Sequence, residues 1–150
     1  MRILMVCLGN ICRSPMAHGI LRDIAKKEGL HIEVDSAGTS AFHSGEPADR
    51  RAQATMAAHH IPINDLRSRQ VETADFYKFD LLFAMDTSNY RNLLTMAPTE
   101  EDKEKVKLIL NEAYPHENKS VPDPYYGGED GFEKVYEMLD LACHQFVERM

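Results

Sequence analysis

The chain has 150 residues, 43% of them hydrophobic and 27% charged, which predicts one folded domain over residues 1–150 and excludes a disordered chain. Its 24 acidic and 17 basic side chains give a formal net charge of −7, which disfavours nucleic acids and membrane surfaces as partners. No apolar run reaches the roughly 18 residues of a membrane span, and three cysteines do not make a disulfide framework, so we expect a cytoplasmic protein.

The predicted elements alternate between strand and helix. The first is Ile3–Val6, a short apolar run that fits a strand buried on both faces. A helix then starts at Ser14-Pro15, a capping residue followed by a proline suited to the first turn, and it ends at Gly29. The rest of the chain predicts strands at 31–35, 79–85 and 106–110, helices at 49–59 and from 87 or 88 to 94, a charged turn at 99–104, and a closing amphipathic helix from Phe132 to Val147.

This alternation predicts a single-domain α/β fold in which a four-stranded parallel sheet carries helices on both faces. In such folds ligands bind beyond the carboxyl ends of the strands. Two irregular segments, 36–48 and 114–130, are rich in glycine, proline and aromatic residues. We expect them to flank the ligand crevice, because long loops in a compact domain are often functional.

The loop after the first predicted strand reads Cys7-Leu8-Gly9-Asn10-Ile11-Cys12-Arg13-Ser14. A tight loop from a strand into a helix can turn its backbone N–H groups toward one point, and the helix N-terminus adds positive potential. Gly9 and Asn10 tolerate the backbone angles of such a turn, and the planar fork of Arg13 can clamp two oxygens of an anion. Residues 8–14 therefore predict a binding site for phosphate or a similar oxyanion.

Cys7 is the candidate nucleophile of this loop. Cysteines at helix N-termini beside a cation can have pKa values lowered to about 3.5–7.5, which favours the thiolate. Ser14 either donates its hydroxyl to this thiolate or caps the helix, and the sequence leaves both open. Cys143 is also followed by an arginine at the same spacing, but it lies in the apolar stripe of the closing helix, which predicts a buried structural thiol.

The segment from Val6 to Pro15 resembles the signature of the low-molecular-weight protein tyrosine phosphatases. The resemblance continues in order through Asp35–Thr39, Ala84–Asp86 and Val121–Tyr126, so it spans nearly the whole chain. Several motifs in one order are more specific than any one of them. The resemblance implies an enzyme that hydrolyses phosphotyrosine and small aryl phosphates through a cysteinyl-phosphate.

The resemblance also implies roles for single residues. Cys7 would attack phosphorus and Arg13 would hold the phosphate, while Asp123 would protonate the departing phenolic oxygen and then activate water. Cys12 would protect the nucleophile through a reversible disulfide with Cys7. Many relatives support the loop with a histidine after the second helix, and segment 65–70 has none. The remaining implied roles are loop support, by hydrogen bonds of Ser36 with Asn10 and Ser14, and substrate walls, formed by Phe42, Tyr125 and Tyr126.

The expected partners are a phosphotyrosine-containing protein or peptide, inorganic phosphate or another oxyanion in the loop, and a cognate tyrosine kinase. We expect no cofactor and no metal, since the spacing of Cys7 and Cys12 does not fit a zinc site. Two alternatives stay open. One is an arsenate reductase, which would need a pair of further cysteines where only Cys143 remains. The other is a phosphotyrosine-binding module without catalysis.

Overall fold

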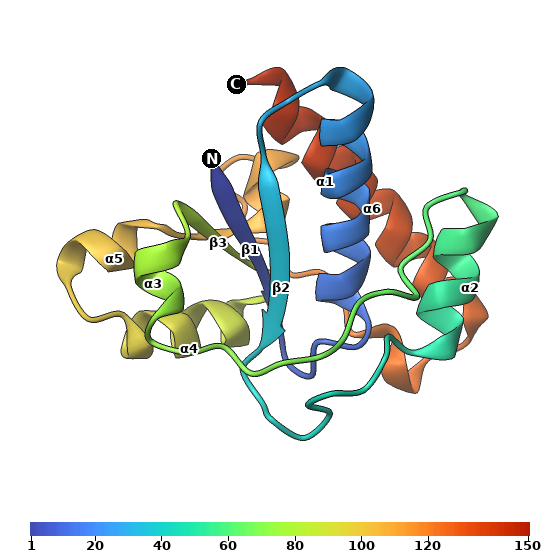
Figure 1. Cartoon of the computed structure of the whole chain (residues 1–150), viewed down its shortest axis with the longest axis horizontal. Helices are drawn as coiled ribbons and strands as arrows, with labels where there is room; N and C mark the ends of the chain where they lie inside the picture. Colours follow the sequence, from blue (N-terminus) through green and yellow to red (C-terminus); the bar gives the residue numbers. More distant parts are fainter.

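Four parallel strands form one sheet in the order β2-β1-β3-β4 (Figure 1). The computed structural model describes residues 1–150, apart from the side chain of residue 129. The strands are β1 (Arg2–Cys7), β2 (Glu33–Gly38), β3 (Leu81–Ala84) and β4 (Val106–Leu108). The predicted four-stranded parallel sheet is confirmed.

Helices cover both faces of the sheet. They are α1 (Arg13–Glu28), α2 (Arg50–Ala58), α3 (Asp75–Lys78), α4 (Thr87–Met96), α5 (Glu100–Glu104) and α6 (Glu129–Glu148). Helices α1 and α6 lie together on one face, and α2 packs against both of them (Figure 1). Helices α3, α4 and α5 lie on the opposite side, where α4 contacts β3 and β4.

The core has two halves, one on each face of the sheet, and β1 supplies both. Ile3 and Met5 point to the half that contains α1 and α6, whereas Leu4 and Val6 point to the half beneath α4. All four side chains are fully buried. Burying one such side chain stabilises the fold by about 1.5–3 kcal/mol, so a continuous apolar run fixes β1 in the middle of the sheet.

Several element boundaries differ from those predicted. Strand β2 lies further along the chain than the predicted 31–35, because Ser36 and Gly38 pair with Met5 and Cys7 of β1. Ser36 is therefore a strand residue and not part of an irregular loop. The predicted charged turn at 99–104 contains a helix, α5, and α3 was not predicted at all. Short 3₁₀ turns occupy Ile109–Glu112, where β4 was expected to continue, and Pro124–Tyr126.

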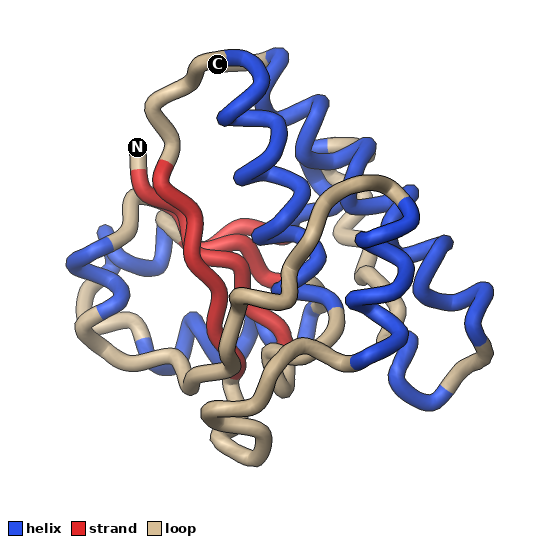
Figure 2. The backbone as a smooth tube through the Cα atoms, turned by 45° about the vertical axis from the view of Figure 1, so that its right-hand side comes forward, coloured by secondary structure: helices blue, strands red, loops and turns tan.

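The sheet order places the connections after β1 and β3 next to each other. The chain leaves β1 toward β2 on one side and reaches β3 on the other, so β1 and β3 flank a topological switch point, where parallel sheets bind ligands. Loops gather at the carboxyl ends of the strands, as Figure 2 shows. Among the described residues, no helix combines the length and apolar character needed to cross a membrane.

Candidate active site

The loop after β1 curls around the sulfur of Cys7. Asn10 has a φ of 57°, in the left-handed region that asparagine tolerates, and its backbone N–H donates to Cys7 Sγ at 3.3 Å. The hydroxyl oxygen of Ser14 lies 2.9 Å from the same sulfur. The loop therefore directs hydrogen-bonding groups at Cys7, as an anion-binding turn should.

Ser14 belongs to the sulfur's surroundings and does not cap a helix. Helix α1 has Cys12 at its N-cap position, without a side-chain capping bond, and Ser14 is its second residue. The side-chain amide of Asn10 donates to Ser14 Oγ at 2.8 Å, and Asn10 Oδ1 accepts the backbone N–H of Arg69 at 3.0 Å. Of the two readings that the sequence left open for Ser14, contact with Cys7 is the one present.

Arg13 joins the loop to two other segments. Its side chain is only 3% exposed, and Nη1 donates to Asp86 Oδ2 at 2.7 Å and to the carbonyl oxygen of Val121 at 2.9 Å. Asp86 follows β3 and also caps α4 by accepting the Asn89 N–H. The Asp86 carboxylate thus fixes the Arg13 guanidinium across the switch point. The sequence did not reveal this role, although Asp86 is the last residue of the motif Ala84–Asp86.

Asp123 approaches the same guanidinium from the loop before α6. Its Oδ2 lies 3.6 Å from Arg13 Nη2, and its Oδ1 accepts the backbone N–H of Tyr125 at 3.0 Å. About a third of the side chain is exposed. Residues predicted from opposite ends of the chain, Cys7 and Asp123, therefore line one cavity together with Arg13.

This cavity has a volume of about 380 Å³ and walls of aromatic side chains. Phe42, Tyr125 and Tyr126 all line it, and Phe42 and Tyr126 are largely exposed; their role as substrate walls stays a prediction. His43, which the sequence did not single out, stands between Phe42 and Tyr125, with ring centroids at 4.8 Å and 6.4 Å from theirs. Leu8, Gly9, Ile11 and Cys12 of the loop after β1 also line the cavity.

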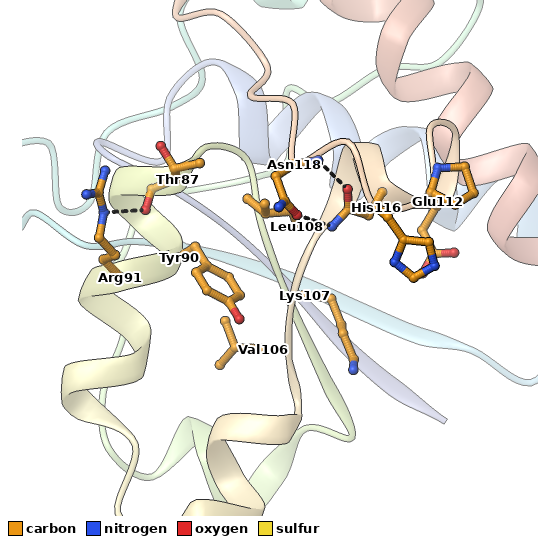
Figure 3. Close-up of a pocket in the computed structure, with 11 residues that line it drawn as sticks. Thr87, Tyr90, Arg91, Val106, Lys107, Leu108, Glu112, His116 and Asn118 are labelled. Carbon is orange, nitrogen blue, oxygen red and sulfur yellow. Dashed lines mark hydrogen bonds between the residues drawn. The ribbon is translucent and has the colours of Figure 1, made fainter.

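A larger cavity of about 720 Å³ lies at the edge formed by β4, away from Cys7. Figure 3 shows Tyr90 and Arg91 of α4 on one side of it and Lys107 of β4 on the other. None of its described lining residues is a cysteine. Size therefore does not locate the chemistry, and the smaller cavity, which holds a thiol, a guanidinium and a carboxylate, is the candidate active site.

Ser36 was expected to support the phosphate-binding loop by hydrogen bonds, but its partner in the structure is a different residue. Among the hydrogen bonds of the described residues, Ser36 Oγ has none with Asn10 or Ser14; it lies 3.0 Å from Nδ1 of His18. His18 stands one turn beyond Ser14 on α1, so the histidine in contact with Ser36 lies on this helix, whereas segment 65–70 has none. Burial, with a smaller contribution from the charge of Arg22, lowers the pKa of His18 from 6.5 to about 4.

The other two cysteines carry buried thiols. Cys143 is 1% exposed, which confirms its predicted place in the apolar core, and burial raises its pKa. Cys12 is 4% exposed, and burial raises its pKa; the negative charge of Asp49 raises it as well, by a smaller amount. Both are therefore neutral thiols near pH 7, and the proposed disulfide of Cys12 with Cys7 stays a prediction.

Comparisons with known proteins all point to one group. Residues 2–150 match the family model described as low molecular weight phosphotyrosine protein phosphatase. A low molecular weight protein-tyrosine-phosphatase of Streptomyces coelicolor is 44% identical over 145 residues, covering 94% of this chain and 88% of that protein.

Solved structures give the same picture. A protein tyrosine phosphatase from Entamoeba histolytica superimposes with a TM-score of 0.93 at 38% identity, covering 99% of this chain and 96% of that one. The arginine phosphatase YwlE, solved as a mutant with a phosphorylated active-site serine, has a TM-score of 0.90 at 28% identity, covering 99% and 95%.

Proposed function

Because the chain belongs to the low molecular weight phosphotyrosine protein phosphatase family, we propose that it hydrolyses phosphotyrosine and small aryl phosphates through a phosphorylated Cys7. Residues 1–150 would act as one catalytic domain. The observation that carries the proposal is the convergence of Cys7, Arg13 and Asp123 on one cavity with aromatic walls. A nucleophile, an anion clamp and an acid are the three groups that this reaction needs.

In the first step, Cys7 Sγ as thiolate attacks the phosphorus of the bound ester. A P–S bond forms while the P–O bond to the phenol breaks, and Asp123 gives its proton to the departing oxygen. Arg13 and the backbone N–H groups of the loop hold the oxygens of the phosphoryl group, so that the charge on them is stabilised in the transition state. Fixation of Arg13 by Asp86 and Val121 supports this role, because a preorganised donor needs no rearrangement during the reaction.

In the second step, water attacks phosphorus and gives a proton to Asp123. The P–S bond breaks, the sulfur leaves as a thiolate and inorganic phosphate is released. The contact between Ser14 and Cys7 supports this step, because a hydrogen bond to the thiolate makes sulfur a better leaving group. YwlE was crystallised with phosphate on an active-site serine, which supports a covalent phospho-enzyme in enzymes of this fold.

The cavity walls support a phenolic substrate. One structural relative is an arginine phosphatase, so the fold alone does not choose between phosphotyrosine and phosphoarginine. The aromatic side chains of Phe42 and Tyr125 can make offset or edge contacts with a phenyl ring, which contribute about 0.5–1.5 kcal/mol beyond burial. The substrate would be a phosphotyrosine-containing protein or peptide, and a cognate kinase stays a prediction, as does the cytoplasmic location.

Hydrolysis of p-nitrophenyl phosphate tests the proposal, with phosphotyrosine and phosphoarginine peptides run in parallel. We expect activity that survives EDTA, that disappears in Cys7→Ser and that favours phosphotyrosine in kcat/KM. Full turnover by Cys7→Ser would overturn the mechanism. A higher kcat/KM for phosphoarginine would overturn the substrate assignment while leaving the nucleophile in place, and faster thiol-dependent reduction of arsenate would favour the reductase.

A further inference from the structure

We propose that Arg51 is a positioning residue that ties the segment carrying Asp123 to the phosphate-binding loop and so places the acid over the leaving group. The inference rests on the proposed function, because it concerns the acid step of that reaction. Arg51 is the second residue of α2 and contributes nothing to the lining of the active-site cavity. It therefore acts through other residues.

One end of this connection is the phosphate-binding loop. The backbone N–H of Asp49 donates to the carbonyl oxygen of Ile11 at 2.8 Å, so the start of α2 is joined directly to the loop. Asp49 caps α2 by accepting the backbone N–H of Arg51 at 2.8 Å. Its two carboxylate oxygens also accept from Nε and Nη2 of Arg51, each at 3.1 Å. Such a two-point pair fixes the plane of the guanidinium.

The other end is the segment with the acid. Arg51 Nη2 donates to the carbonyl oxygen of Tyr125 at 3.0 Å, and the guanidinium carbon lies 5.5 Å from the centre of the Tyr125 ring. On the α6 side it lies 4.8 Å from the ring of Phe132. Tyr125 is thus held at its carbonyl by Arg51 and at its N–H by Asp123. The chain of contacts runs from Ile11 through Asp49, Arg51 and Tyr125 to Asp123.

The charges keep this connection intact around neutral pH. Burial raises the pKa of Asp49, but the hydrogen bonds from Arg51 outweigh this and lower the pKa overall. The hydrogen bond with Asp49 likewise raises the pKa of Arg51. Both groups are therefore ionised wherever the enzyme works, and lysine could not replace the arginine, because it lacks the fork that reaches Asp49 and Tyr125 together.

The expected consequence is confined to the acid. Without Arg51, the 123–126 segment loses its bond to α2, while Cys7 keeps its contacts with Asn10 and Ser14. Arg13 keeps its bonds to Asp86 and to the Val121 carbonyl. A misplacement of about 1 Å can cost about 100-fold in rate, and an acid is useful only within hydrogen-bond reach of the leaving oxygen. A phenol with a high pKa needs this proton, whereas dinitrophenolate leaves without it.

The experiment compares kcat/KM for phenyl phosphate and 2,4-dinitrophenyl phosphate in Arg51→Met and Arg51→Lys. For both variants we expect a loss of about 10- to 100-fold with phenyl phosphate and a much smaller loss with the dinitrophenyl ester. In an Asp123→Ala background, Arg51→Met should cause little further loss, because the group that it positions is gone. Arg50→Met, on the neighbouring exposed residue of α2, is the matched control and should leave both values unchanged.

Two further measurements distinguish a positioning role of Arg51 from a general effect on folding. The rate of Cys7 alkylation and the inhibition constant of inorganic phosphate should match the wild type in both Arg51 variants, since neither depends on the acid. Equal losses with both esters, or an undiminished loss in the Asp123→Ala background, would overturn the inference. Arg51→Lys, which keeps the charge and most of the side chain, covers the case in which Arg51→Met does not fold. Absence of any Cys7-dependent hydrolysis in the wild type would instead refute the proposed function.

Discussion

Replacement of Gly38 by alanine should damage the active site through the backbone of the phosphate-binding loop. Gly38 is the last residue of β2 and pairs with Cys7. A Cβ atom there would lie 2.6 Å from the carbonyl oxygen of Leu8 and 3.1 Å from the backbone nitrogen of Asn10. The first distance falls about 0.8 Å short of ordinary van der Waals contact, so the loop has to move by a comparable amount.

The magnitude follows from that displacement. A shift approaching 1 Å at the groups that hold the phosphate should lower kcat/KM by about 100-fold. The overpacking itself should cost about 1–3 kcal/mol of stability. The loop cannot slide freely, because the N–H groups of Thr39 and Ser40 hold the carbonyls of Cys7 and Leu8 at 2.9 Å. We therefore expect both effects in Gly38→Ala, measured with phenyl phosphate kinetics and thermal unfolding.

Gly19→Ala is the matched control. Its Cβ would lie 2.5 Å from a methyl carbon of Ile63 and 3.1 Å from the Met56 side chain, an overlap inside the core where α1 packs against α2 and the segment after it. It should lower Tm as Gly38→Ala does and leave kcat/KM near the wild-type value. Wild-type kcat/KM in Gly38→Ala, or an equal loss of activity in Gly19→Ala, would refute the reasoning.

Three other substitutions test single contacts. The pKa of His18 is 6.5 when unfolded and about 4 when folded, so on acidification the unfolded state binds the proton first. The free energy of unfolding should therefore fall by up to about 3 kcal/mol between pH 6.5 and 4. In urea titrations at pH 7, 5 and 4, His18→Gln should lose this part of the pH dependence, and an unchanged pH dependence would contradict the prediction. Asp86→Asn keeps a capping side chain for α4 but weakens the bond to Arg13, so kcat/KM should fall about 10-fold or more, and wild-type kinetics would exclude that role. Cys12→Ser should make inactivation by hydrogen peroxide irreversible to dithiothreitol, and full recovery would remove Cys12 as the protecting thiol.

The sequence predicted best what is local in the chain. The loop from Cys7 to Ser14 was predictable because its members follow one another between an apolar strand and the start of a helix. The pairing of Ser14 with the sulfur could not be decided, since a serine at the start of a helix serves both as a cap and as a hydrogen-bond donor. Cys143 was assigned to the core from helical periodicity alone.

What could not be predicted depends on which side chains meet across the fold. Arg13 is held by Asp86, 73 residues away, and only the strand order brings them together. Segment 65–70 has no histidine, and the histidine that contacts Ser36 is His18 of α1, which the sequence analysis did not single out. Nothing in the sequence distinguished Arg51, because the carbonyl that it binds lies 74 residues further along.

Covalent trapping of the reaction tests the central claim most directly. In the proposed mechanism Asp123 activates the attacking water, so Asp123→Ala should slow the release of phosphate from the enzyme. This variant can be mixed with a phosphotyrosine peptide, quenched rapidly and analysed by mass spectrometry after proteolysis. We predict one phosphoryl group on the peptide that contains Cys7, bound through sulfur, and none in the double variant with Cys7→Ala. Phosphate on another residue, or turnover without any phosphorylated Cys7, would contradict the mechanism.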